Sequence, residues 1–200
     1  LLVVRTKEAV ENKEVVSLAY IGNVVDVWER FYEENIYIHI GSDQTSLHIP
    51  WTGGYYPVGI SYEESNRLIR EEPVLFKDKV QKSLRRHAAA INKHTERGTY
   101  FFDYGNAFLL ESSRAEADVM AKNNIDFKYP SYVQDILGPM FFDYGFGPFR
   151  WVCTSGKPKD LDTTDKIAAL VLKNIMENSP KEIQSQMKDN IKWIKNAKKK

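Results

Sequence analysis

The first sixty residues alternate between short apolar runs and one amphipathic stretch. An apolar run at residues 15–21 is followed by Gly22 and Asn23, and residues 24–34 then place apolar side chains at helical spacing. A second apolar run covers residues 36–40. Short apolar runs closed by turn residues are typical of buried parallel strands. The pattern predicts a strand, a helix and a strand, a βαβ unit with parallel strands and a right-handed crossover.

Helical patterns become more frequent after this unit. Residues 43–60 are aperiodic and rich in turn formers, and loops of that length are often functional. Ser61 and Glu64 match a capping box that begins a helix. Pro73 suits the first turn of a second helix, which we expect to run to Gly98. We interpret both helices as structural.

The remainder is expected to contain, in order, a strand at 100–105, a helix from 106 toward 120, a polar loop at 121–128, an aperiodic stretch at 129–156, and helices at 163–177 and 180–200. Composition changes near Ser61, so we expect a domain boundary between residues 1–60 and 61–200. The predicted fold class is α/β, with a partial Rossmann-like parallel sheet that continues into a mixed α/β domain.

Composition and charge exclude several classes of protein. Hydrophobic residues make up 42% of the chain and charged residues 28%, as in an ordinary folded domain. The formal net charge of +1 gives no field that would attract nucleic acid or an anionic membrane. No apolar run approaches the roughly 20 residues of a membrane helix. We therefore expect a soluble protein with neither a nucleic-acid nor a membrane partner.

The cysteine, the histidines and the chain ends add three expectations. The single cysteine, Cys153, excludes an internal disulfide and suits a reducing compartment. The four histidines show no metal-binding spacing, so no metal site is predicted, and we interpret His87 with its neighbours Arg85 and Arg86 as charge on a helix surface. A chain that starts with Leu1 and ends in three lysines suggests a piece of a longer protein.

Polar residues follow both strands of the predicted βαβ unit. Ligands of open α/β sheets bind outside the carboxyl ends of parallel strands. Asn23 could offer amide hydrogen bonds there to a ribose, a phosphate or a nicotinamide, or it could simply make the turn with Gly22. Thr45 and Ser46 could bind a phosphate, or their segment could be a polar loop in which Asp43 caps its own backbone.

Two aromatic segments offer further candidates. Tyr55 and Tyr56 follow a pair of glycines that would allow close approach of a ligand, although a packed surface loop has the same composition. Arg150 lies among large aromatic residues, where partial dehydration would strengthen its grip on a carboxylate or a phosphate. An internal salt bridge is the alternative for Arg150.

Taken together, these segments resemble the urocanase family. The matching runs lie in one order at residues 41–48, 53–58, 83–86, 102–111, 129–134 and 145–156, and the resemblance extends over essentially everything from Val15 onward. The sequence departs from the family pattern at Ile49 and Thr52, where members usually carry asparagine, and at Glu116, where they usually carry glycine. The length implies a fragment of a longer, animal- or protozoan-like member.

The resemblance implies a hydro-lyase. Urocanases add water to urocanate during histidine degradation, giving 4-imidazolone-5-propionate, and hold NAD+ tightly as an electrophile. It also implies a cytoplasmic homodimer, with residues 1–60 ending the NAD-binding Rossmann-like domain and 61–200 forming part of the core domain. An NAD-dependent dehydrogenase, or an inactive fragment with only a structural role, is the alternative.

The resemblance also implies functional residues, and it leaves the catalytic ones outside this chain. Arg150 corresponds to the residue that binds the substrate carboxylate. The cofactor contacts correspond to Asn23, Val24, Gln44, Thr45, Ser46, Leu47, His48, Tyr55, Tyr56 and Tyr104. Because the glycine-rich turn that binds the pyrophosphate would precede Leu1, the isolated chain is expected to be inactive.

Overall fold

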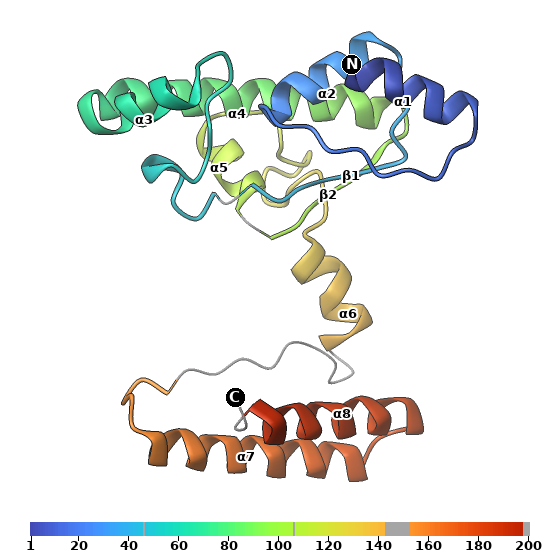
Figure 1. The fold of residues 1–200 in the computed structure, drawn as a ribbon, viewed down its shortest axis with the longest axis vertical. Helices are drawn as coiled ribbons and strands as arrows, with labels where there is room; N and C mark the ends of the chain where they lie inside the picture. Colours follow the sequence, from blue (N-terminus) through green and yellow to red (C-terminus); the bar gives the residue numbers. More distant parts are fainter. Residues whose placement is uncertain (46, 106, 143–152, 198–200) are drawn as a thin grey trace. The chain divides into compact units, whose positions relative to one another are not determined.

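The computed structural model describes residues 1–45, 47–105, 107–142 and 153–197 (Figure 1). The chain divides into two compact units, Leu1–Val133 and Gln134–Lys200. No helix in the described ranges combines the length and the apolarity that crossing a bilayer requires.

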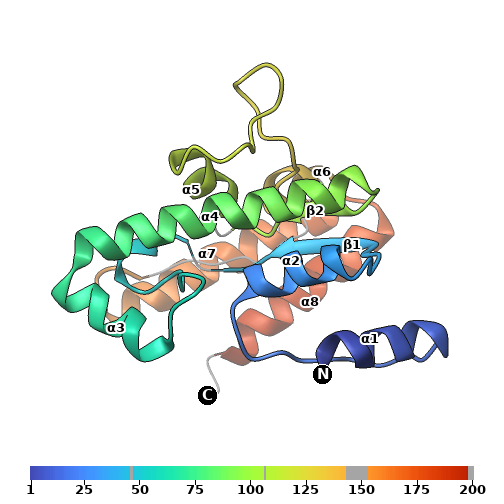
Figure 2. The ribbon, with the colours of Figure 1, turned by 90° about the horizontal axis from the view of Figure 1, so that it is seen from above.

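The first unit is built around one long helix. Its elements are α1 (Leu2–Glu11), α2 (Val24–Glu33), β1 (Ile40–Asp43), a 3-10 turn (Pro50–Thr52), α3 (Tyr62–Glu71), α4 (Pro73–Glu96), β2 (Tyr100–Asp103) and α5 (Phe108–Arg114). Helix α4 contacts α2, α3, α5 and β2 (Figures 1 and 2). Ser61 caps α3, where its hydroxyl accepts the backbone N–H of Glu64 at 3.2 Å, and Pro73 begins α4. Both helices confirm the sequence prediction.

The two strands form a parallel sheet. Ile40 lies opposite Tyr100, and the register runs to Asp43 opposite Asp103. The connection between the strands contains α3 and α4, so the parallel crossover is long and helical, as parallel strands require. The predicted α/β class with a partial parallel sheet is confirmed.

One predicted strand is wrong and another is shifted. Residues 15–21 form no strand, and the side chains of Val15 and Ile21 are fully exposed. The second strand begins at Ile40, where the expected strand over residues 36–40 was to end. A strand needs a neighbour for its backbone hydrogen bonds, and within the described ranges β1 pairs only with β2. Helix α2 is therefore not the crossover of a βαβ unit.

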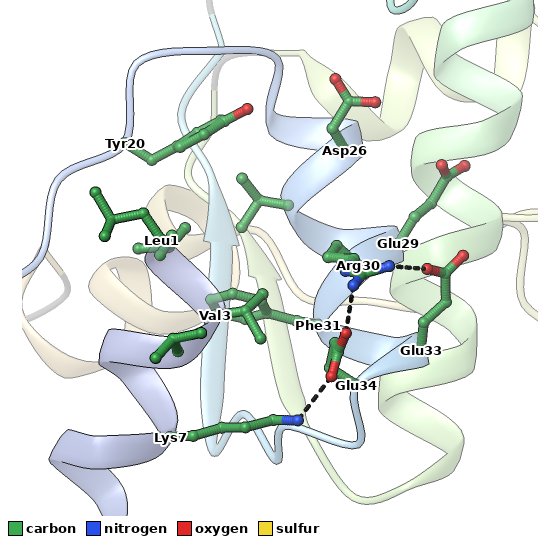
Figure 3. A pocket seen from close by; sticks show the side chains of 13 residues that line it. Leu1, Val3, Lys7, Tyr20, Asp26, Glu29, Arg30, Phe31, Glu33 and Glu34 are labelled. Carbon is green, nitrogen blue, oxygen red and sulfur yellow. Dashed lines mark hydrogen bonds and ion pairs between the residues drawn. The ribbon is translucent and has the colours of Figure 1, made fainter.

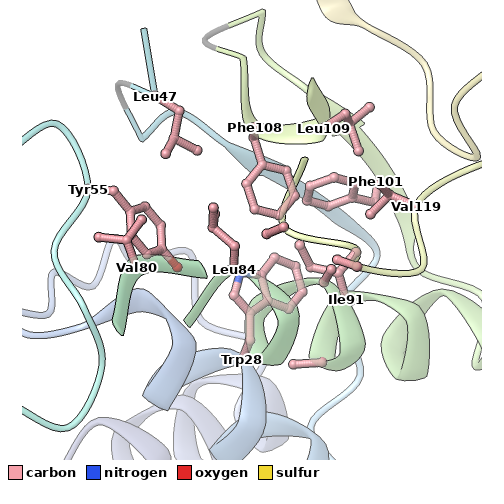
Figure 4. Packing of buried hydrophobic residues seen from close by; sticks show 14 of the residues in the cluster. Trp28, Leu47, Tyr55, Val80, Leu84, Ile91, Phe101, Phe108, Leu109 and Val119 are labelled. Carbon is pink, nitrogen blue, oxygen red and sulfur yellow. The ribbon is translucent and has the colours of Figure 1, made fainter. Parts of the chain in front are cut away.

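The core of the first unit joins the segments before and after residue 60. Trp28 packs edge-on against Phe101, with ring centroids 6.1 Å apart, and Leu84 of α4 lies in the same cluster (Figure 4). Leu47 and Tyr55, from the segment between β1 and α3, belong to the same cluster. Because one core spans both segments, the structural division falls at Val133 and not at the composition change near Ser61.

The second unit contains a helical hairpin. A π-helical turn at Tyr132–Leu137 crosses the division between the units and leads into α6 (Gly138–Met140). Helices α7 (Pro158–Glu177) and α8 (Lys181–Ala197) pack on each other, which confirms the last predicted helix pair. The buried side chains at their interface are those of Leu172, Met187 and Ile194.

Candidate functional site

Two buried aspartates terminate the strands of the parallel sheet. Asp43 ends β1 and Asp103 ends β2, and each carboxylate accepts the backbone N–H of the residue two positions later. The distances are 2.9 Å from Thr45 N to Asp43 Oδ1 and 2.9 Å from Gly105 N to Asp103 Oδ1. Both loops at this edge of the sheet are therefore fixed to the strand ends by the same type of turn.

The second oxygen of each aspartate is also used. Asp43 Oδ2 accepts the Thr45 hydroxyl at 2.8 Å, and Asp103 Oδ2 accepts the backbone N–H of Leu109 at 3.1 Å. The structure thus confirms that Asp43 caps its own loop. Burial raises the pKa of Asp43 to about 6, with a smaller contribution from the charge of Asp103, while the hydrogen bonds from Thr45 oppose the shift.

A buried histidine lies beside Asp43. His87 of α4 has no exposed surface, and its Nδ1 lies 3.4 Å from the Tyr55 hydroxyl. On the other side of the ring, Nε2 lies 3.8 Å from Asp43 Oδ2 and has no hydrogen-bond partner. Burial lowers the pKa of His87 to about 3, so the imidazole is neutral near pH 7.

The interpretation of His87 as surface charge is therefore wrong. The sequence did contain a signal for its burial, because His87 follows Leu84 by three residues and precedes Ile91 by four. This spacing places His87 on the apolar stripe of α4, and both neighbours are fully buried.

Three residues with implied cofactor contacts are buried. Leu47 and Tyr55 belong to the core, and burial raises the pKa of the Tyr55 phenol. Asn23 caps α2, since its Oδ1 accepts the backbone N–H of Val25 at 3.0 Å. Its Nδ2 donates to the Tyr56 carbonyl at 2.7 Å, so both polar groups of Asn23 have protein partners.

Other residues with implied cofactor contacts present accessible groups. Val24 is 37% exposed, and Gln44 and His48 are exposed in the loop after β1. Tyr56 is half-buried and its hydroxyl donates to the Ile60 carbonyl at 2.8 Å. Ser46 and Arg150 lie outside the described residues. The cofactor and substrate roles of all these residues stay predictions.

An aromatic pair lies beyond the end of β2. The Tyr104 ring is 39% exposed and stacks on Tyr132, with centroids 5.2 Å apart and planes 11° from parallel. Tyr132 was absent from the candidates. Tyr132 lies in the run at residues 129–134 that matches the urocanase family, which could have marked it as a candidate. Nothing in that run indicates that it contacts Tyr104.

An open pocket between α1 and α2 is separate from this edge of the sheet (Figure 3). In this pocket the Glu34 carboxylate forms ion pairs with Lys7 at 2.7 Å and with Arg30 at 2.5 Å. None of the candidate site residues lines the pocket. Within the described ranges, no group of three histidine, cysteine or acidic side chains is arranged to hold a metal ion.

Comparisons with known proteins cover both units. Residues 2–136 match the family model of the urocanase Rossmann-like domain, and residues 139–200 match that of the urocanase C-terminal domain. These limits agree with the structural division after Val133.

Relatives match along most of this chain. It is 54% identical over 192 residues to the "Probable urocanate hydratase" of Dictyostelium discoideum, covering 94% of this chain and 28% of the relative. It is 51% identical over 203 residues to the mouse "Urocanate hydratase", covering 98% of this chain and 30% of the relative. The human "Urocanate hydratase" is 51% identical over 201 residues, covering 96% and 30%. The chain thus spans less than a third of its relatives' length, and it belongs to the urocanase family.

Proposed function

We propose that this chain is part of a urocanate hydratase, a hydro-lyase that adds water to urocanate and gives 4-imidazolone-5-propionate. The observation that carries the proposal is the match of both units to urocanase domains, together with 51–54% identity to proteins named urocanate hydratase. The homodimer, the cytoplasmic location and the role in histidine degradation belong to the same proposal.

NAD+ is the proposed cofactor. The carboxyl ends of β1 and β2 lie side by side, and nucleotides of open α/β sheets bind at such edges. The residues fit a nucleotide because Gln44 and His48 are accessible there, while the loop that carries them is held by Asp43. NAD+ would supply an electrophilic ring that withdraws electrons from the bound substrate.

The chain's own residues would bind and orient the ligands. Gln44, His48 and backbone amides of their loop would donate hydrogen bonds to the nucleotide, and the exposed face of Tyr104 would stack on one of its rings. Arg150 would bind the urocanate carboxylate through two parallel hydrogen bonds. Asn23, Leu47 and Tyr55 would act from the core by shaping the surrounding backbone.

The activity can be tested on the complete polypeptide in which this chain occurs. We expect urocanate absorbance to fall while the bound NAD+ is recovered unreduced. NADH formed in amounts equal to the urocanate consumed would reject hydration and support a dehydrogenase. Isothermal titration of the 200-residue chain with NAD+ tests whether this part of the protein binds the cofactor by itself. We expect no micromolar affinity.

Arg150 can be tested separately from the cofactor. We expect Arg150→Ala to raise the KM for urocanate at least about tenfold and to leave NAD+ retention unchanged, because the lost contact is to the substrate. Arg70→Ala, at an exposed position in the last turn of α3, is the matched control and should change neither quantity. Equal losses of urocanate and NAD+ binding in Arg150→Ala would reject the carboxylate role.

A further inference from the structure

His87 lies where two segments of the candidate site meet the start of α5. Asp43, which fixes the loop carrying Gln44 and His48, lies 3.8 Å from its Nε2. Tyr55, next to Tyr56, lies 3.4 Å from its Nδ1. The ring of Phe108, at the start of α5, lies 4.7 Å from the imidazole centroid. One buried side chain thus contacts an anchor of each segment.

One tautomer of the neutral imidazole suits both of its polar neighbours. A neutral imidazole carries a proton on only one nitrogen. If the Tyr55 hydroxyl donates to Nδ1, then Nε2 carries the proton and points it toward the Asp43 carboxylate. At 3.8 Å this second pair is an electrostatic contact that a movement of about 1 Å would convert into a hydrogen bond.

Asp43 connects His87 to the loop that follows β1. Its two oxygens hold the backbone N–H and the hydroxyl of Thr45, so the position of the carboxylate sets the position of the loop. Tyr55 is fixed from the opposite side by its burial in the core. The distance between the two cofactor segments therefore depends on the side chain that separates them, which is His87.

We propose that His87 is a positioning residue of the nucleotide site, which holds the Asp43–Thr45 turn and Tyr55 at a fixed separation so that both segments face one nucleotide. This inference rests on the proposed binding of NAD+. A histidine that served only the core would affect stability without affecting the affinity of the folded protein for the nucleotide.

The chain provides a matched control on the same helix. His94 of α4 is 1% exposed, and its Nε2 lies 2.8 Å from the Trp28 carbonyl oxygen. It packs edge-on against Trp28 and Tyr32 and makes no described contact with the cofactor segments. A substitution at His94 therefore disturbs a buried histidine of α4 at a distance from the candidate site.

Three variants separate positioning from packing. His87→Phe keeps a ring and loses both polar contacts, His87→Gln retains an amide that can reach toward Asp43, and His94→Gln is the control. In the 200-residue chain, hydrogen exchange of the Thr45 amide is measured by NMR. In the complete polypeptide, the NAD+ dissociation constant is measured well below the melting temperature of every variant.

We expect His87→Phe to accelerate Thr45 exchange and to weaken NAD+ binding, each at least about tenfold, because the loop loses its support from the core. His87→Gln should stay within about threefold of the unsubstituted protein in both measurements. His94→Gln should lower the melting temperature and leave both measurements unchanged.

The outcomes distinguish this inference from the proposed function. Unchanged Thr45 exchange in His87→Phe overturns the positioning role whether or not NAD+ binds. Faster exchange with an unaltered dissociation constant overturns it as well, and so does an equal effect of His94→Gln. If the unsubstituted complete polypeptide does not bind NAD+, the proposed function fails and the role of His87 at a nucleotide site falls with it.

Discussion

Asp43 and Asp103 are register partners at the last position of the parallel sheet, and each holds the loop that follows it through a backbone N–H two residues later. Two carboxylates are therefore buried at one edge of the sheet. Each is compensated by two hydrogen bonds, which is how a protein retains buried acidic groups. The two loops are hydrogen-bonded to the sheet where they begin, while the side chains of Gln44 and His48 farther along the first loop are exposed.

Asp43→Asn should change how stability depends on pH. The pKa of Asp43 is raised from 3.8 to about 6 in the folded state, so its contribution to stability is full below pH 4 and is lost as pH rises through 6. Asparagine does not ionise, so the variant does not lose this stability as pH rises. We expect the free energy of unfolding of Asp43→Asn, relative to the unsubstituted chain, to improve by up to roughly 3 kcal/mol between pH 4 and 7 in urea titrations.

His87→Gln provides the opposite test. The pKa of His87 is lowered from 6.5 to about 3, so its contribution is full above pH 6.5 and is lost as pH falls toward 3. The slopes of His87 and Asp43 partly cancel in the unsubstituted chain. We expect stability to fall with rising pH in His87→Gln and to rise in Asp43→Asn between pH 4 and 6. Parallel pH profiles for all three proteins would contradict both assignments.

The sequence predicted the helices better than the strands. Helices α3 and α4 carry their own start signals in Ser61 and Pro73, and these signals are local. The apolar run at residues 15–21 has the composition of a strand, but a strand also needs a hydrogen-bonding neighbour, which composition does not encode.

The candidate site was predicted as positions and not as contacts. The expectation that Asp43 could cap its own loop was correct because that turn spans only two residues. The contact between His87 and Asp43 joins residues 44 positions apart across α4 and β1, and no local pattern indicates it. Likewise, Asn23 was recognised as a turn residue, but its hydrogen bond to the Tyr56 carbonyl depends on the tertiary fold.

Asn23→Ala should destabilise the first unit by about 1–2 kcal/mol, because α2 loses its cap and the Tyr56 carbonyl loses a donor. Asn23→Ser is the matched variant, since its hydroxyl can still accept the Val25 N–H as a helix cap but it lacks the amide that donates to Tyr56. We expect a smaller loss for Asn23→Ser in thermal unfolding followed by circular dichroism. Equal losses in the two variants would show that the cap contributes nothing.

Gly41→Ala should destabilise the fold through a steric clash. A Cβ at Gly41 would lie 2.4 Å from Cη2 of Trp28, and Trp28 is held by edge contacts with His94 and Phe101. Relieving such a clash typically costs 1–3 kcal/mol. We expect a loss of about this size in urea titrations, with a change in tryptophan fluorescence. A second substitution, Trp28→Phe, should make the added methyl group less costly, and an unchanged cost would locate the strain elsewhere.

Met187→Ala should unfold the α7–α8 hairpin selectively. Met187 is fully buried between the two helices, and removing such a side chain costs about 2–5 kcal/mol in a typical core. We expect loss of the NMR signals of α7 and α8 with those of the first unit unchanged. Trp193→Ala is the control, because Trp193 is 63% exposed, and it should leave the hairpin folded.

Glu116→Gly should stabilise the protein. Glu116 follows α5 with a φ of +63°, and the N–H of Glu116 donates to the Ser113 carbonyl while that of Ala117 donates to the Ser112 carbonyl. This is a Schellman motif, whose left-handed position favours glycine. Relief of the backbone strain outweighs the added freedom of the unfolded chain, and we expect a gain of about 0.5–1 kcal/mol.

Glu116→Ala separates backbone strain from charge. Alanine removes the carboxylate but retains the Cβ that makes the left-handed conformation costly. If strain governs this position, urea titrations should show the gain for Glu116→Gly and little change for Glu116→Ala. Equal gains in the two variants would instead assign the effect to the negative charge near the carboxyl end of α5, where the helix dipole is unfavourable for an acidic group.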